Sequence, residues 1–134
     1  HQAKADNPQV DAFIEQVRQA DGIIIASPEY HSGVSGVLKN ALDFLTKDEV
    51  EHKAVGLMAV CGGASGGTST LNGLATIMGA LHAMVIPQQV IIGKSYQSVD
   101  EHNQIIDQDV VKRIAQVSQK VVQFSHWHRV YQAA

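Results

Sequence analysis

The segment SPEYHSGVSGVLKNALDF (residues 27–44) follows an apolar run and contains several groups that can hold a ligand. Tyr30 can lie against a planar ring because its own ring has apolar faces. Ser32 and Gly33 can offer backbone N–H groups, and the helix expected after them would direct its positively polarised N-terminus at the same place. These residue types indicate a site for a flat, polar ligand. A plain polar turn, in which Glu29 caps the helix, is the alternative.

A second candidate segment, CGGASGGTST (residues 61–70), also follows an apolar run. Its glycines leave backbone N–H groups uncovered, and the helix that begins after them adds partial positive charge. Gly67 stands where a P-loop would have the lysine before Thr68, so the sequence excludes a nucleoside triphosphatase of that type. Either the backbone here passes close to a flat polar group, or the segment is a tight turn between a strand and a helix.

Alternating apolar patterns surround both segments. Helical spacing begins at Asn7 and Pro8, a good cap and first helical residue, and ends at Asp21 and Gly22, where glycine suits a left-handed cap. Continuous apolar runs, typical of strands buried on both faces, then alternate with further helical patterns. The expected strands are residues 23–25, 55–60 and 85–92, the last interrupted by Pro87, and the later helices are residues 34–45, 71–81 and 110–124, with a loop over residues 93–106.

This alternation of helices and strands predicts a parallel sheet with helices on both faces. Ligands of such sheets bind beyond the carboxyl ends of the strands, and both glycine-containing segments fall at that edge. We therefore expect residues 1–134 to form a single domain in which the two segments face one ligand.

The composition narrows the choice of partners. The chain has 134 residues, a formal net charge of −3 and no basic stripe, so a nucleic-acid surface is not expected. No apolar run is long enough to cross a membrane, so no membrane partner is expected. Cys61 is the single cysteine, so no internal disulfide can form, and a reducing, cytoplasmic compartment is expected.

Other reactive side chains fit structural roles better. His126 and His128 would point apart on a helix, so no metal site is expected there. Cys61, next to glycine, fits a small packing residue better than a redox centre. Asp107 and Asp109 suit the positive end of the last helix better than a catalytic pair.

The first segment resembles the signature of the NADPH-dependent FMN reductase family, which is close to S/T-P-E-Y-N-x-S-x-P-G-x-L-K-N-A-I-D-W. CGGASGGTSTL resembles the second loop of that family, often G-G-x-x-G-G, and LHAMVIPQQV resembles the segment after its next helix. The family comprises flavodoxin-like oxidoreductases, including azoreductase-like, quinone-reductase-like and chromate-reductase-like members. The resemblance covers nearly the whole chain and implies a flavodoxin-like, three-layer α-β-α fold with a parallel sheet.

The resemblance also implies which residues hold the flavin ring. One wall would be Pro28, Glu29, Tyr30, His31 and Ser32, mostly through backbone groups, and the other wall Gly62, Gly63, Ser65 and Gly66. Lys39, Asn40 and Asp43 match the family pattern as well, and we interpret them as positioning or interface residues. No catalytic side chain is implied, since the cofactor carries the chemistry.

The function implied is that of an FMN-dependent oxidoreductase. It would pass hydride from NADPH or NADH through the flavin to a quinone, an azo compound, a metal oxyanion or free flavin. Family members commonly form homodimers or homotetramers. Two alternatives stay open: a flavodoxin-type electron carrier without reductase turnover, and a flavin-free assembly module.

The chain departs from the family pattern in three places. His31, whose ring can titrate near neutral pH, replaces asparagine, and Ser35 replaces proline, which would leave the helix start less rigid. The first strand of the family, its phosphate loop (G-S-x-R-x-x-S) and its second strand have no counterpart here. We therefore expect an N-terminally truncated domain whose apolar strand, residues 23–25, is an exposed edge. A short protein that borrows a strand from another copy is the alternative.

Overall fold

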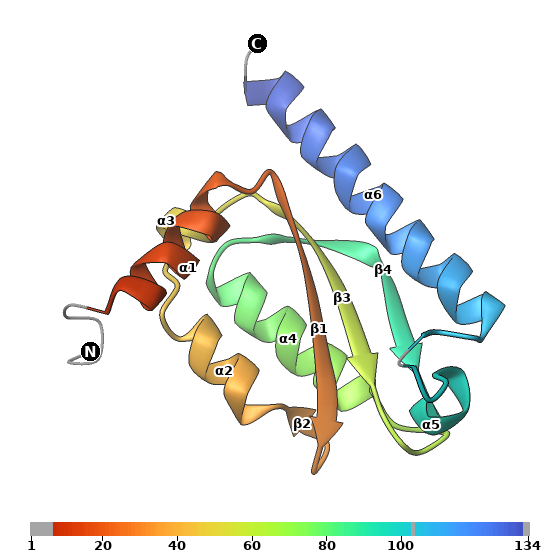
Figure 1. The fold of residues 1–134 in the computed structure, drawn as a ribbon. Coiled ribbons are helices and arrows are strands. Elements are labelled where there is room, and N and C mark those ends of the chain that lie inside the picture. The colour runs from red at the N-terminus through yellow and green to blue at the C-terminus, as the bar shows by residue number, and fades with distance from the viewer. Residues whose placement is uncertain (1–6, 103, 133–134) are drawn as a thin grey trace.

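The computed structural model describes residues 7–102 and 104–132, whose strands form one four-stranded sheet. The strand order is β2-β1-β3-β4, with β1, β3 and β4 parallel and β2 antiparallel to the end of β1 (Figure 1). The strands are β1 (Gly22–Tyr30), β2 (Gly33–Val34), β3 (Ala54–Val60) and β4 (Met84–Ile92). The predicted parallel sheet is confirmed.

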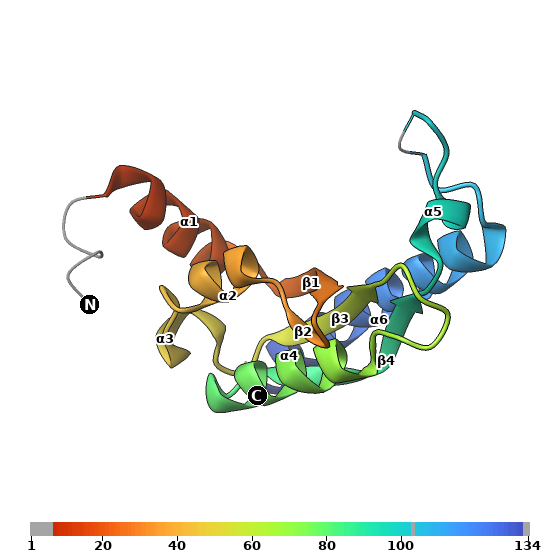
Figure 2. The same ribbon diagram turned by 90° about the horizontal axis from the view of Figure 1, so that it is seen from below.

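Helices cover both faces of this sheet. They are α1 (Pro8–Gln19), α2 (Gly36–Leu42), α3 (Lys47–Val50), α4 (Thr68–Ala80), α5 (Ser95–Ser98) and α6 (Gln108–Gln132). Side chains from α2, α3 and α4 share one buried cluster with the sheet, and side chains from α6 share the other. The result is a three-layer α-β-α arrangement, as predicted (Figure 2).

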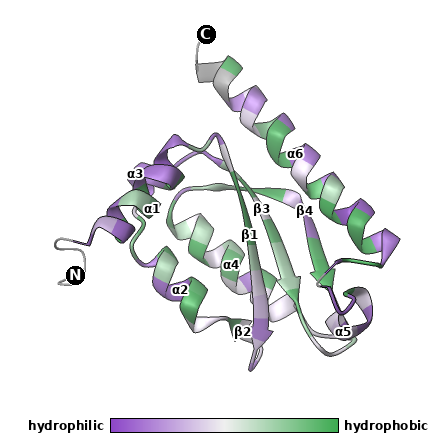
Figure 3. Cartoon of the chain, viewed as in Figure 1, coloured by the Kyte–Doolittle hydropathy of each residue, from purple (hydrophilic) through white to green (hydrophobic). Residues whose placement is uncertain are grey.

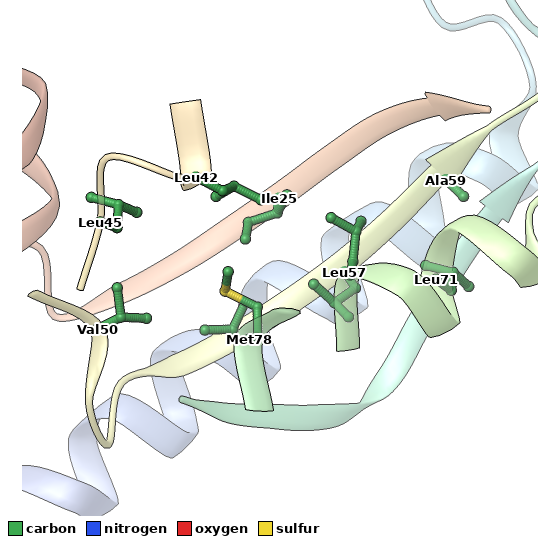
Figure 4. Packing of buried hydrophobic residues seen from close by; sticks show 10 residues of the cluster. Ile25, Leu42, Leu45, Val50, Leu57, Ala59, Leu71 and Met78 are labelled. Atoms are coloured by element: carbon green, nitrogen blue, oxygen red, sulfur yellow. The ribbon is translucent and has the colours of Figure 1, made fainter. Parts of the chain in front are cut away.

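The two cores follow the alternation of side chains along β3. Leu57, which is fully buried, packs with Ile25 and Met78 between the sheet and α4, and Figure 4 shows these side chains in one layer. Met58, the next residue, belongs to the opposite core with Val117 of α6. Because β3 is covered on both faces, it is apolar along its length, whereas α6 alternates polar and apolar turns (Figure 3).

The start of α1 is as predicted and its end is not. The Asn7 side chain accepts a hydrogen bond from Gln9 N at 3.1 Å, and Pro8 is the first helical residue. The predicted left-handed glycine cap is wrong: Ala20 in extended conformation is the C-cap, and Gly22 begins β1. A Cβ atom on Gly22 would lie 2.5 Å from Ser125 Oγ, so glycine is needed there for the packing of α6.

Several elements differ from the sequence prediction. The short helix α5 lies within the predicted loop of residues 93–106, and Val34, predicted to begin a helix, lies in β2. β1 extends to the end of the SPEY motif and turns back as β2. The short helix α3 lies in the charged connector, where Glu49 Oε2 accepts hydrogen bonds from Thr46 N and Thr46 Oγ1, both at 2.8 Å, in a capping box. β4 continues through Pro87, because the register with β3 shifts between Val55 and Leu57 and leaves the proline at a bulge of an edge strand.

The outer edge of β1 is open, as expected from the sequence. Within the described residues, no strand pairs with β1 between Gly22 and Pro28 on the side away from β3. A hollow of about 390 Å³ lies between this edge and α6, lined by residues that include Ile24 and Val122. None of the described helices is both long enough and apolar enough to cross a membrane.

Candidate functional site

A tight hairpin presents the first candidate segment at the carboxyl end of β1. Tyr30 pairs with Gly33, so His31 and Ser32 form a two-residue turn, and both have positive φ, 51° and 59°. Such turns match the twist of the flanking strands and favour asparagine or glycine. The family's asparagine thus has a conformational reason, and histidine is among the residues that tolerate this region. The three side chains at positions 30–32 are exposed.

Hydrogen bonds fix the return of this hairpin into α2. Ser27 is fully buried, and its hydroxyl accepts from Ser35 N at 3.1 Å and donates to Pro28 O at 2.9 Å. The Ser35 side chain accepts from Leu38 N at 3.3 Å and caps α2. Ser35 has φ −60°, the value that proline would impose, but proline could not donate to Ser27. In this chain, hydrogen bonds of Ser35 therefore fix the start of α2, where the family pattern has the rigid ring of proline.

The glycines of the second segment divide into two pairs. A Cβ atom added to Gly62 or Gly63 would meet nothing within 4 Å, so packing within the described protein does not require glycine there. A Cβ atom on Gly66 would lie 2.7 Å from Glu29 Oε1. A Cβ atom on Gly67 would lie 2.6 Å from the Ile91 side chain, and Gly67 also has a positive φ of 99°. The first pair forms an exposed, bare stretch of backbone, which we call the glycine platform; the second pair is needed for packing.

The carboxylate of Glu29 joins the two segments. Its Oε2 accepts from Thr70 Oγ1 at 2.9 Å and from Thr70 N at 3.3 Å. The Gly67 N–H group, followed by the Thr70 groups, lowers the pKa of Glu29 below its usual value. The N-cap residue of α4 is Gly67, which has no side chain that could accept a hydrogen bond from the first turn. Glu29 of β1 supplies the capping oxygen instead. The alternative that Glu29 caps the helix directly after it is wrong, since Ser35 does so.

A third turn, within the loop predicted over residues 93–106, meets the same edge. Lys94 N donates to Gly63 O and Ser95 N donates to Cys61 O, each at 3.1 Å. A Cβ atom on Gly93 would lie 3.0 Å from Gly63 O, so the turn sits tightly on the second segment. The position of the third strand could have indicated this, because parallel strands end at one edge.

The remaining candidates have structural partners. Cys61 is buried, and its Sγ lies 3.5 Å from Gly63 O, in keeping with a packing role. Asp107 Oδ1 accepts from Asp109 N at 2.9 Å at the start of α6, as predicted for a helix start. Lys39 of α2 and Asp43, the C-cap of that helix, form an exposed ion pair in which Nζ lies 2.7 Å from Oδ1.

The two walls predicted for the flavin therefore lie next to each other. Pro28, Glu29, Tyr30, His31 and Ser32 occupy the end of β1 and its turn, and Gly62, Gly63, Ser65 and Gly66 occupy the adjacent loop after β3. The convergence of the two segments is confirmed by the contacts of Glu29. Which of these residues touch the cofactor stays a prediction.

Known proteins resemble this chain in both sequence and fold. It is 45% identical over 76 residues to an NADPH azoreductase of Bacillus sp. (strain OY1-2), a match that covers 57% of the chain and 43% of that protein. It is 36% identical over 110 residues to a quinone reductase of Escherichia coli (strain K12), covering 78% and 58%. The chain spans about half the length of the curated relatives it matches.

A solved structure of an oxidoreductase from Corynebacterium diphtheriae superposes with a TM-score of 0.75 at 17% identity, covering 90% of this chain and 64% of that one. A flavodoxin from the domain Archaea superposes with a TM-score of 0.61 at 13% identity, covering 87% and 71%. These likenesses show the fold, which is flavodoxin-like. The family model described as NADPH-dependent FMN reductase matches residues 1–97, well over half of the chain. The chain belongs to the NADPH-dependent FMN reductase family.

Proposed function

We propose that this chain forms the ring-binding part of an FMN-dependent oxidoreductase that uses NADPH or NADH. The observation that carries the proposal is the exposed glycine platform beside the exposed turn at His31 and Ser32. The Glu29 carboxylate, at the base of this turn, bonds to Thr70 at the start of α4, where the glycine-containing loop ends. A fused planar ring needs such a place: a flat floor of backbone with N–H groups and a wall that does not collapse onto it. Family membership supports FMN as the group that fits.

The structure refines how each predicted residue would act. Tyr30, His31 and Ser32 are exposed and would contact the ring from one side, with Gly62, Gly63 and Ser65 on the other. Glu29 and Gly66 would act indirectly. The Glu29 carboxylate already accepts hydrogen bonds from Thr70, and Gly66 packs against that carboxylate. Pro28 would act through its backbone. Together these residues would orient the ring and exclude water from it, and no side-chain nucleophile is needed.

The bound flavin would accept hydride from the nicotinamide and pass reducing equivalents to the acceptor. Quinones and azo compounds are the acceptor classes that the relatives' names support, and metal oxyanions and free flavin are further candidates. We propose a cytoplasmic location, in keeping with the single cysteine. We also propose one domain over residues 1–134 and a homodimer or homotetramer. Val37, 86% exposed on α2 near Lys39 and Asp43, supports an interface on that helix.

The test is a titration of the full chain with FMN, followed by flavin fluorescence. We expect Gly63→Val and Tyr30→Ala to weaken FMN affinity about tenfold or more, since each alters one wall of the site. Gly79→Val is the matched control, because Gly79 also has nothing within 4 Å of an added Cβ but lies in α4. Urea unfolding of each variant separates a binding defect from a folding defect.

Steady-state NADPH consumption in the presence of a quinone then distinguishes the alternatives. A chain that binds FMN but consumes no NADPH would be an electron carrier. A chain that binds no FMN would contradict the proposal and favour an assembly module. Equal FMN affinity of wild type, Gly63→Val and Tyr30→Ala would contradict the placement of the ring.

A further inference from the structure

The N-terminus of α4, at the end of the second glycine-containing segment, is filled by a carboxylate of the protein itself. Glu29 Oε2 accepts from Thr70 Oγ1 at 2.9 Å and from Thr70 N at 3.3 Å, and the Gly67 N–H group donates to the same carboxylate. A helix of 13 residues would otherwise offer these groups to an anion at its positively polarised end. The place that a ligand's phosphate or carboxylate would take is therefore occupied.

The Glu29 carboxylate is enclosed as well as bonded. Its other oxygen, Oε1, lies 2.7 Å from the position of a Cβ atom on Gly66, so the loop backbone passes directly beside it. Thr70 is fully buried, and Glu29 reaches it from the end of β1, where Glu29 itself pairs with Val34 of β2. The carboxylate is thus held between β1 and α4, and moving it aside would break both of its bonds to Thr70.

The negative charge of Glu29 persists at neutral pH and is matched by the helix. The N–H group of Gly67, more than any other contact, lowers the pKa of Glu29 below its usual value. Among the described residues, no lysine, arginine or histidine forms an ion pair with Glu29. The partial positive charge of α4 is its partner and is already used. A second anion at this place would meet a like charge, which disfavours its binding.

The glycine platform differs from this closed end of the segment. A Cβ atom on Gly62 or Gly63 would meet nothing within 4 Å, and both residues are exposed. Bare backbone of this kind can lie against a planar group and offer it hydrogen bonds. One end of the segment is therefore open to a ligand, and the other end is closed by Glu29.

We propose that Glu29 determines which class of ligand group the second glycine-containing segment accepts. Glu29 excludes anionic groups from the N-terminus of α4 and leaves the glycine platform to an uncharged planar ring. It acts through this exclusion and need not touch the ring. The inference rests on the function proposed above for the identity of that ring, and it places the phosphate of a bound FMN away from α4.

Inorganic phosphate is the first probe, titrated into the full chain at constant ionic strength and followed by backbone amide NMR. Wild type should show no saturable shift of the Gly67 and Thr70 signals. Glu29→Ala, which vacates the position, should show saturable shifts of both signals and bind phosphate at least about tenfold more tightly than wild type. Sodium formate should raise the melting temperature of Glu29→Ala more than sodium chloride does, because formate can replace the lost carboxylate.

Glu101→Ala is the matched control, since Glu101 is an exposed carboxylate outside this contact, and it should respond to both anions as wild type does. Saturable binding of phosphate at Gly67 and Thr70 in wild type would overturn the proposal, and this measurement needs no variant. A folded Glu29→Ala chain that gains neither phosphate binding nor stabilisation by formate would also overturn it.

Riboflavin and FMN then compare the ring without and with its phosphate. Both should shift the Gly62 and Gly63 signals of wild type, and FMN should affect Gly67 and Thr70 no more than riboflavin does. Larger shifts of Gly67 and Thr70 with FMN would contradict the exclusion of anions. Binding of neither flavin would contradict the proposed function alone, because the phosphate and formate titrations need no flavin.

Discussion

The carboxyl edge of the sheet and the outer edge of β1 are built in opposite ways. At the carboxyl edge, three turns are joined by polar contacts: Glu29 to Thr70, Lys94 to Gly63, and Ser95 to Cys61. Along the outer edge of β1 between Gly22 and Pro28, the described residues supply no paired strand, and residues that include Ile24 and Val122 border a hollow. The described turns of the first edge are bonded to one another, whereas the described residues leave the second edge unpaired over most of β1.

The contacts that position the candidate site are therefore independent of whatever covers the outer flank of β1. The contacts at the carboxyl edge join Glu29 of β1 with Thr70 of α4, and the turn after β4 with the loop after β3. None of them involves a neighbour of β1 along its outer side between Gly22 and Pro28. We therefore expect the site's geometry to be determined by the described residues even where the flank of the sheet is open. The predictions that follow test this separation.

The largest effect is expected in the interior of the sheet. Leu57→Ala should lower the free energy of unfolding by about 3 kcal/mol, because Leu57 is fully buried and the substitution leaves a cavity. Ile24→Ala should cost about 1 kcal/mol, because Ile24 is 44% exposed at the open edge. Urea unfolding of both variants gives the two values. Equal losses of stability would show that the flank of β1 is covered in solution, which would contradict the description of this edge as open.

Much of the fold could be predicted from local sequence signals. The cap at Asn7, the apolar runs and the helical spacing depend on neighbouring residues, and they predicted the parallel sheet and most of the helices. The short helix α3 was missed because its capping box, Thr46 with Glu49, lies in a charged stretch without apolar periodicity. The cap of α1 was misassigned because Gly22 is needed by the distant residue Ser125, which no local pattern reveals.

The candidate site could be predicted only in part. The two segments were found from their residue types and from the resemblance, and their meeting followed from parallel strands. The bond from Thr70 to Glu29 and the bond from Lys94 to Gly63 link residues far apart in the sequence, so spacing could not indicate them. The left-handed turn at His31 was missed because histidine and serine are not the residues that usually mark it.

A smaller effect, confined to the carboxyl edge, is expected from Glu29→Gln. The folded-state pKa of Glu29 lies below its unfolded value, so its charge stabilises the fold above the unfolded value of 4.5, and this contribution is lost as pH falls through the folded-state pKa. At pH 7 the variant should melt at a lower temperature than wild type. The two melting temperatures should converge as the pH is lowered through the folded-state pKa of Glu29.

Glu101→Gln is the control, since Glu101 is an exposed carboxylate outside this edge, and its effect should be near zero at both pH values. Amide hydrogen exchange adds the spatial test. Glu29→Gln should speed exchange at Gly67 and Thr70 and leave the β1 edge unchanged. Faster exchange along all of β1 would mean that the two edges are coupled.

The smallest effect is expected from His31→Asn, in the turn itself. Asparagine adopts positive φ more readily than histidine, so the variant should be about 0.5 kcal/mol more stable than wild type. His102→Asn is the matched control, because His102 is an exposed loop histidine without positive φ and should gain nothing. Urea unfolding of both variants measures the gain. Equal gains in stability in both variants would contradict the claim that the positive φ at position 31 favours asparagine.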